Sequence, residues 1–428
     1  MLNRYIGNKN CIIDLLINEI NNNCNKGDFI CDAFSGSLAV SFALKKEGYK
    51  IACNDINLFS YFYGKHLIEQ HQLPNVNPYD FMPYNQVQLF TEKALHWINS
   101  LSPSRNNYLF LKDKENVASY QNILSIYFYL NEMVNSNKIN KNPENFIFNT
   151  YTEEGNNSYF ESSRGTSGRR KFFTPLNGKK IDYILAQIRE WKKNDKFSDS
   201  FFYYTLVCSL MDSIEKVSNT QGTYHDFPRE SYDSRAYLEL KLIPPDYDGI
   251  LTTIKDHIVG CKEDSLEFIE KIPEHSLLYL DPPYNFRQYT SYYFLPNIIC
   301  EYSDIDDLDE YFSKVQFVRG QNMDGDFTST FSKKNMFMDS LSKLISKSKA
   351  KKVMLSYFDG RNHWNNTKNL KDRQGKDILW EFFNSSIFFP GKSNYFPIER
   401  LNYQSYGGHK ARNINELVFL GEKFEVLE

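Results

Sequence analysis

The stretch that most constrains this chain runs from Leu277 to Tyr284, where an apolar segment of strand length ends in Asp-Pro-Pro-Tyr. Proline has no backbone N–H and a fixed φ, so a strand inside a sheet must end at Pro282. The result is a rigid corner at the carboxyl end of a strand, where open α/β sheets bind their ligands. A carboxylate, a main-chain carbonyl and a ring meet there, and they suit an exocyclic amine on a planar base. An ordinary strand-ending turn is the alternative for this string taken alone.

The early part of the chain predicts a β-α-β unit. A short apolar strand over residues 28–34 is broken by Ser-Gly-Ser at 35–37, and residues 38–47 have the pattern of a helix. The next strand, residues 50–55, ends in an acid roughly 20 residues after Asp32, a spacing typical of sites whose strand-end carboxylate binds ribose hydroxyls. The G-x-G-x-x-G fingerprint is absent, which disfavours a dinucleotide and an oxidoreductase. A βαβ unit without a ligand is the alternative.

The later part of the chain repeats this pattern. A strand at 258–260 is followed by Asp264, a helix over 266–271 and the strand that leads into the corner. We therefore expect an α/β fold whose sheet domain comprises residues 1–73 and 255–428. Further expected elements are a helix over 12–20, a helix over 333–349 and strands over 352–357, 385–389 and 416–420.

Residues 74–254 are expected to form a mainly helical inserted domain. Helical patterns cover 91–101, 121–133, 181–193 and 202–214, and the first two lie in an Asn- and Tyr-rich region to which we assign no chemistry.

Residues 164–180 carry six Lys and Arg and no acid, together with Phe172 and Phe173, whereas the whole chain has a net charge of −3. Cations interleaved with aromatic rings suit phosphate contacts and base stacking, and a solvated loop is the alternative. The polar loop 218–224 could read base edges or be a plain turn. The candidate nucleic-acid contacts are Arg164, Arg169, Arg170, Lys171, Asn219, Thr220, Tyr224, Arg287, Tyr289, Lys410 and Arg412.

The seven cysteines are scattered, without a Cys-x-x-Cys pair or a metal-like grouping with histidine. They are typical of reduced thiols, so we expect a cytoplasmic protein without a metal site. The first residues lack the apolar core of a signal peptide, and no apolar run is long enough to span a membrane.

Residues 164–180, 218–224 and 281–293 resemble a subset of Dam-like (D12 class, α-group) N6-adenine DNA methyltransferases that belong to restriction–modification systems. In their order along the chain, five motifs resemble those of the whole Dam-like group. They are residues 3–9 (Asn-Arg-Tyr-Ile-Gly-Asn-Lys), residues 32–37 (Asp-Ala-Phe-Ser-Gly-Ser), Asp55, Asp264 and residues 281–284. In that group the target-recognition segment lies between the two halves of the sheet, as the insertion does here. Leu38 departs from the pattern, because the family often has glycine at this position.

The resemblance implies a seven-stranded Rossmann-like fold that binds S-adenosyl-methionine. Phe34 and the turn 35–37 would line the methionine end, Asp55 would accept the ribose hydroxyls and Asp264 the adenine amino group. Tyr5 and Lys9 would close over the cofactor. The cofactor-binding residues are thus Tyr5, Lys9, Asp32, Phe34, Ser35, Gly36, Ser37, Asp55 and Asp264, and the catalytic residues are Asp281, Pro282, Pro283 and Tyr284.

The activity implied is methyl transfer to N6 of an adenine flipped out of duplex DNA. Asp281 and the Pro282 carbonyl would accept the two N6 hydrogens, and Tyr284 would stack on the base. An N4-cytosine methyltransferase and a catalytically silent DNA-binding relative are the alternatives. The expected partners are double-stranded DNA and, in a restriction–modification system, a cognate endonuclease; the chain is expected to be a monomer or weak dimer.

Overall fold

The computed structural model describes residues 5–101, 107–163, 165–220, 223–285, 287–325, 327–360, 362–364, 374–401 and 413–424. The chain divides into two compact units. The sheet unit comprises Asn3–Glu69, Ile254–Tyr292 and Phe327–Glu428, and the helical unit comprises Gln70–Thr253 and Tyr293–Asp326.

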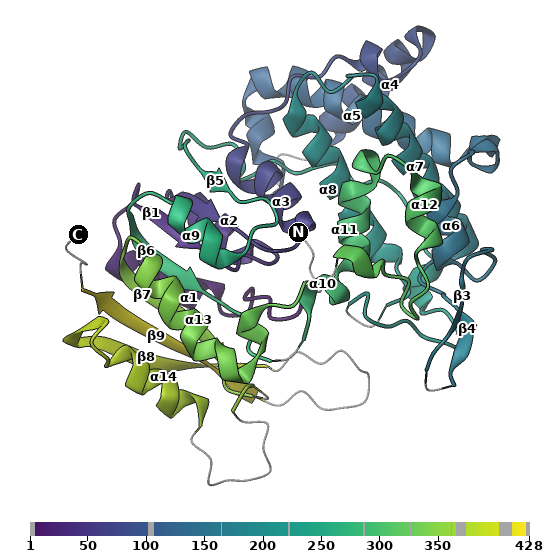
Figure 1. The fold of residues 1–428 in the computed structure, drawn as a ribbon. Coiled ribbons are helices and arrows are strands. Elements are labelled where there is room, and N and C mark those ends of the chain that lie inside the picture. Colours follow the sequence, from purple (N-terminus) through teal and green to yellow (C-terminus); the bar gives the residue numbers. More distant parts are fainter. Residues whose placement is uncertain are drawn as a thin grey trace. The chain divides into compact units, whose positions relative to one another are not determined.

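The sheet unit is built on seven strands in the order β5-β2-β1-β6-β7-β9-β8 (Figure 1). The first five are parallel, whereas β9 runs antiparallel to both β7 and β8. The predicted Rossmann-like α/β fold with seven strands is confirmed. The strands are β1 (Phe29–Asp32), β2 (Lys50–Cys53), β5 (Ile258–Val259), β6 (His275–Leu280), β7 (Ala350–Phe358), β8 (Phe388–Leu401) and β9 (Asn413–Lys423).

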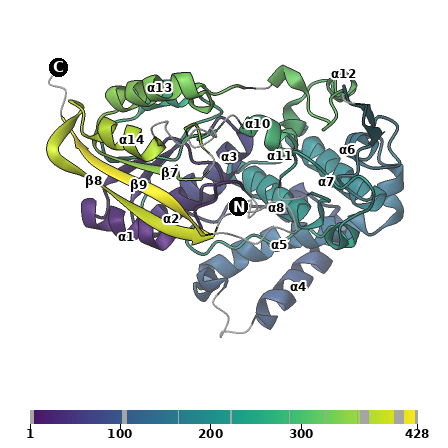
Figure 2. The same ribbon diagram turned by 90° about the horizontal axis from the view of Figure 1, so that it is seen from below.

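Helices cover both faces of this sheet. On one face, α9, α13 and α14 form a core with strand residues such as Leu278 and Leu355. Figure 2 shows α1 and α2 on the opposite face. The helices of the sheet unit are α1 (Ile13–Asn23), α2 (Ala39–Lys46), α3 (Leu58–Tyr63), α9 (Ser265–Lys271), α10 (Tyr289–Tyr292), α13 (Lys334–Lys347) and α14 (Gly375–Phe383).

The topology brings distant acids to one edge of the sheet. The carboxyl ends of parallel strands meet at a single edge, and β1 ends at Asp32, β2 just before Asp55 and β6 just before Asp281. Because β9 is antiparallel, its beginning lies at the same edge, where Glu416 pairs with Phe358 at the end of β7.

The helical unit contains α4 (Tyr84–Ser100), α5 (Lys114–Val134), α6 (Phe146–Tyr151), α7 (Pro175–Lys193), α8 (Ser200–Val217), α11 (Phe294–Glu301), α12 (Leu308–Ser313) and a hairpin of β3 (Tyr159–Glu161) and β4 (Ser167–Arg169). Its boundaries differ from the sequence prediction by a few residues at Gln70 and Ile254, and in one longer segment. Tyr293–Asp326, expected in the sheet domain, belongs to the helical unit. The reason is packing: α11 is apolar, and Cys300 on this helix contacts Met211 of α8.

None of the described helices is long and apolar enough to cross a membrane. Within the same ranges, no group of three or more His, Cys, Asp or Glu side chains is arranged to hold a metal ion. All seven cysteines are free thiols.

Candidate active site

A cavity of about 970 Å³, including its open mouth, lies at the carboxyl edge of the strands in the sheet unit. Pro282 is buried. The cavity wall includes most of the predicted cofactor and catalytic residues and two of the predicted nucleic-acid contacts, namely Tyr5, Lys9, Asp32, Phe34, Ser35, Gly36, Ser37, Asp55, Asp264, Asp281, Pro283, Tyr284, Arg287 and Tyr289.

Asp55 fixes the turn that follows β1. Its Oδ2 accepts a hydrogen bond from Gly36 N at 3.0 Å, and its Oδ1 accepts from the backbone N and side-chain Nδ2 of Asn57 at 2.9 Å each. Burial raises the pKa of Asp55, although the hydrogen bonds from Asn57 and Gly36 oppose the rise. Oδ1 already accepts two hydrogen bonds, whereas Oδ2 has a second lone pair, so this carboxylate can also accept from a ligand hydroxyl through Oδ2.

Asp32 presents an unsatisfied acceptor in the cavity wall. Ser41 Oγ donates to its Oδ2 at 2.6 Å, whereas Oδ1 has no hydrogen-bond partner among the described residues. Burial raises the pKa of Asp32 to about 7. A buried acceptor without a partner is costly in an empty site, so it fits a ligand that brings a donor such as an amino group.

Leu38, the departure from the family pattern, keeps the backbone that glycine would adopt. Its φ is 65° and its side chain is fully buried. This left-handed conformation costs a leucine about 1–2 kcal/mol. The substitution therefore leaves the glycine-like backbone of the turn in place.

Tyr5 lies over the same turn. A Cβ atom built on Gly36 would be 2.6 Å from the Tyr5 ring, and the centroid of that ring is 5.8 Å from the Tyr289 centroid. Gly36 is therefore required for this close approach. Asp264, which also lines the cavity, caps α9, because its Oδ1 accepts from Leu266 N at 2.8 Å; its Oδ2 is left for a ligand.

The corner after β6 contains the predicted catalytic residues. Asp281 has a 19% exposed side chain, and its Oδ2 lies 2.7 Å from Lys9 Nζ. The Tyr284 ring is nearly buried and packs on Phe358 with 5.0 Å between the centroids. Burial raises the pKa of Asp281 to about 6, although the neighbouring Lys9 ammonium opposes the rise.

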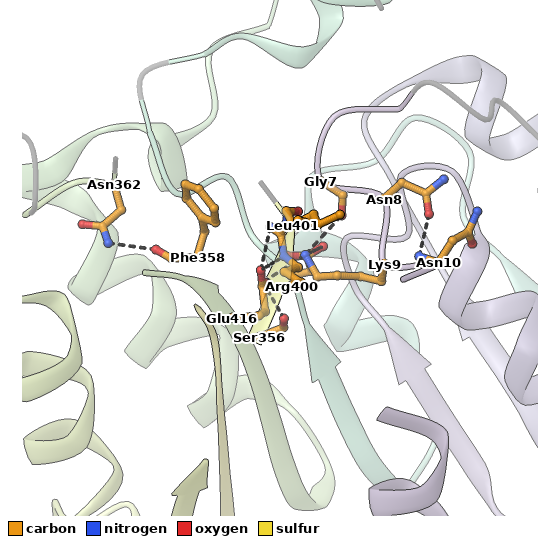
Figure 3. A network of polar contacts seen from close by, with 11 residues as sticks. Gly7, Asn8, Lys9, Asn10, Ser356, Phe358, Asn362, Arg400, Leu401 and Glu416 are labelled. Atoms are coloured by element: carbon orange, nitrogen blue, oxygen red, sulfur yellow. Dashed lines mark hydrogen bonds and ion pairs between the residues drawn. The ribbon is translucent and has the colours of Figure 1, made fainter. Parts of the chain in front are cut away.

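The sequence analysis did not identify Glu416 and Arg400, two charged residues in the cluster around Asp281. Lys9 Nζ also lies 3.1 Å from Glu416 Oε1, and Arg400 donates to Glu416 Oε2 at 2.9 and 3.0 Å (Figure 3). Lys9 is therefore directed at two carboxylates, which differs from the prediction that it covers the cofactor. The signal in the sequence is Glu416 itself, an acid at the start of the apolar strand 416–420. Only the order and direction of the strands in the sheet show that it lies near Asp281.

Two cations of the basic run 164–180, Arg170 and Lys180, are buried within the helical unit. Arg170 is 1% exposed, and its guanidinium donates to the carbonyls of Asn157, Phe317 and Val318 at 2.8 to 3.2 Å. Because these backbone carbonyls accept the hydrogen bonds of the guanidinium, the prediction that Arg170 contacts phosphate is wrong. Lys171 forms an ion pair with Glu153, whereas Arg169 remains exposed.

The described residues of the loop predicted to read base edges are also internal. Asn219 is fully buried, donates to Lys171 O at 2.7 Å and accepts from Asp233 N at 2.8 Å. Thr220 and Tyr224 are buried as well, so these three predicted base contacts are corrected to structural residues. The predicted contacts Arg164, Lys410 and Arg412 lie outside the described residues.

We expect Arg170→Met to lower the free energy of unfolding by about 3 kcal/mol, because it leaves three buried carbonyls without a donor. Lys179→Met is the matched control, since this partly exposed lysine of the same run should change stability by less than about 0.5 kcal/mol. Urea unfolding of both variants measures the difference. Equal stabilities would contradict the structural role of Arg170.

Comparison with known proteins gives a family and several relatives. The family model described as "D12 class N6 adenine-specific DNA methyltransferase" matches residues 5–164 and 133–355. The chain is similar to the Type II methyltransferase M.FokI of Planomicrobium okeanokoites, with 25% identity over 424 residues, 98% of this chain and 52% of that protein. It is similar to the Modification methylase StsI of Streptococcus sanguinis, with 27% identity over 279 residues, 65% of this chain and 38% of that protein.

A third relative, the Type II methyltransferase M.NlaIII of Neisseria lactamica, is 37% identical over 140 residues, 33% of this chain and 40% of that protein. The chain thus spans between 38% and 52% of the length of these three curated relatives.

Proposed function

Because the chain belongs to the D12 class of N6-adenine-specific DNA methyltransferases, we propose that it methylates N6 of an adenine in double-stranded DNA, as the modification enzyme of a restriction–modification system. The observation that carries the proposal is the position of Asp281. Its carboxylate follows β6 at a double-proline corner and shares one cavity with Asp32, Asp55 and Asp264. One cavity thus offers acceptors for a methyl donor and for an amine.

The methyl donor that fits these acceptors is S-adenosyl-methionine, which supplies an electrophilic methyl group on a sulfonium. Asp55 would accept from the ribose hydroxyls and Asp264 Oδ2 from the adenine amino group. Asp32 Oδ1, which has no partner in the described part of the chain, would accept from the amino group of the methionine end. Tyr5 would cover this end, because it already lies over Gly36.

The amine of adenine is a weak nucleophile, because its lone pair is delocalised into the ring. Asp281 Oδ1 and the Pro282 carbonyl would accept its two hydrogens, localise the lone pair and stabilise the positive charge that develops on N6. Much of the rate would come from holding amine and methyl group in line. The base must leave the duplex, and Tyr284 would recover about 1–3 kcal/mol of that cost by stacking.

Arg287 and Tyr289 would contact the DNA near the flipped base. Both line the cavity just after the corner, and the Arg287 guanidinium lies 6.0 Å from the centroid of the Tyr292 ring. A cation beside aromatic rings suits a phosphate next to an unstacked nucleotide.

The test is methyl transfer with a radiolabelled donor to DNA from a host without DNA methylases, followed by nucleoside analysis. We expect the label on N6-methyladenine only, and sequencing of the product DNA would give the recognition site. Label on N4-methylcytosine would favour the cytosine alternative. A folded protein that labels no nucleic acid would contradict the proposal.

A further inference from the structure

Four charged side chains, two of which line the cavity, form a closed cluster of two cations and two anions. Lys9 Nζ lies between Asp281 Oδ2 at 2.7 Å and Glu416 Oε1 at 3.1 Å, and Arg400 binds the other oxygen of Glu416. Lys9 and Glu416 are 3% and 0% exposed. Buried charges are costly unless they are paired, and each charge of this cluster is paired.

Glu416 is the most constrained member. Its Oε1 accepts from Ser356 Oγ at 2.8 Å as well as from Lys9, and its Oε2 accepts from Nε and Nη2 of Arg400. Ser356 and Arg400 belong to β7 and β8, the two strands that flank β9 (Figure 3). The position of Glu416 is therefore set by three strands, whereas Lys9 comes from a segment without regular structure.

On the premise of the proposed function, we propose that Glu416 is a positioning residue for methyl transfer: it holds the Lys9 ammonium on one oxygen of Asp281, so that the other oxygen faces the adenine amine. Lys9 Nζ lies 2.7 Å from Oδ2 of Asp281, and this contact restricts the rotation of the carboxylate. Because Glu416 also binds the Lys9 ammonium, Lys9 offsets less of the negative charge on Asp281. Asp281 therefore remains a good hydrogen-bond acceptor for the amine. Glu416 itself touches neither the amine nor the donor.

The charges around Asp281 predict that the loss of Lys9 and the loss of Glu416 shift the pKa of Asp281 in opposite directions. Burial raises the pKa of Asp281 to about 6, the positive charges of Lys9 and Arg400 lower that pKa, and the negative charge of Glu416 raises it. The active form is the ionised carboxylate, so the transfer rate should fall as the pH decreases through about 6. The other titratable groups that face Asp281 are Asp32 from β1, Tyr279 from β6 and Tyr284 from the corner.

The test is the single-turnover rate of methyl transfer between pH 5 and 9 at saturating donor and DNA, so that donor binding at Asp32 does not contribute. For Glu416→Gln we expect an at least tenfold lower rate at pH 8 and an acid limb moved to lower pH by about half a unit or more. For Lys9→Met we expect the limb to move to higher pH, and for Lys9→Arg a limb close to that of the wild type. If Glu416 and Lys9 had only structural roles, their variants would not move the acid limb in opposite directions.

Glu422→Gln is the matched control, because it makes the same chemical change on β9 about 20 Å from Glu416. Its pH profile should equal that of the wild type. An unmoved limb in folded Glu416→Gln would overturn the inference while the proposed function stands; a wild-type protein that methylates no adenine overturns both. If Glu416→Gln does not fold, the two Lys9 variants decide, and an unmoved limb in Lys9→Met overturns the inference.

Discussion

We expect Asp281→Ala to transfer methyl groups at least about 10³-fold more slowly than the wild-type chain, with unchanged affinity for S-adenosyl-methionine. The variant removes the carboxylate that would accept an N6 hydrogen and stabilise the charge on N6. Donor binding should persist, because the acceptors proposed for the donor are Asp32, Asp55 and Asp264, at the ends of other strands or beside α9.

Single-turnover transfer measures the first effect and calorimetry with the donor measures the second. Asp281→Asn is the informative companion, since it keeps the shape of the side chain and loses the charge. Lys9 retains Glu416 as a partner in both variants, so thermal unfolding should confirm that they fold. A transfer rate within tenfold of the wild type in Asp281→Ala would show that another group accepts the amine.

The residues that sequence reasoning found share one property: a local pattern specified them. Asp32, Asp55 and Asp281 each follow or end a short apolar strand, and parallel strands bring such positions together whatever their order in the chain. The cavity could therefore be predicted before its strand order was known. Glu416 could not, because it reaches the same edge only through the antiparallel direction of β9.

Charge in the sequence was a poorer guide than strand ends. Arg170 and Lys180 belong to the most basic run of the chain, but both are buried and bonded to acceptors within the helical unit. A sequence gives the sign of a charge and not its distance from solvent, so a run of cations alone did not identify an interface. The polar loop with Asn219 was misinterpreted for the same reason, since its amide satisfies backbone groups instead of ligands.

We expect Asp55→Ala to raise the dissociation constant for S-adenosyl-methionine at least about 100-fold, because it removes a charged acceptor for the ribose hydroxyls. The same carboxylate holds the turn through Gly36 N, so its loss should also loosen the wall at the methionine end. The rate at saturating donor should fall by less than about tenfold, since the amine is bound elsewhere by Asp281.

Donor titration by calorimetry and single-turnover rates at increasing donor concentration separate these two effects. Asp28→Ala is the matched control, because Asp28 lies beside the opposite end of β1 and its side chain accepts from Asn25 N. An Asp55→Ala variant with unchanged donor affinity would remove Asp55 from the donor site. A much lower transfer rate with unchanged donor affinity would instead indicate that Asp55 acts on the amine, which is the role that we assign to Asp281.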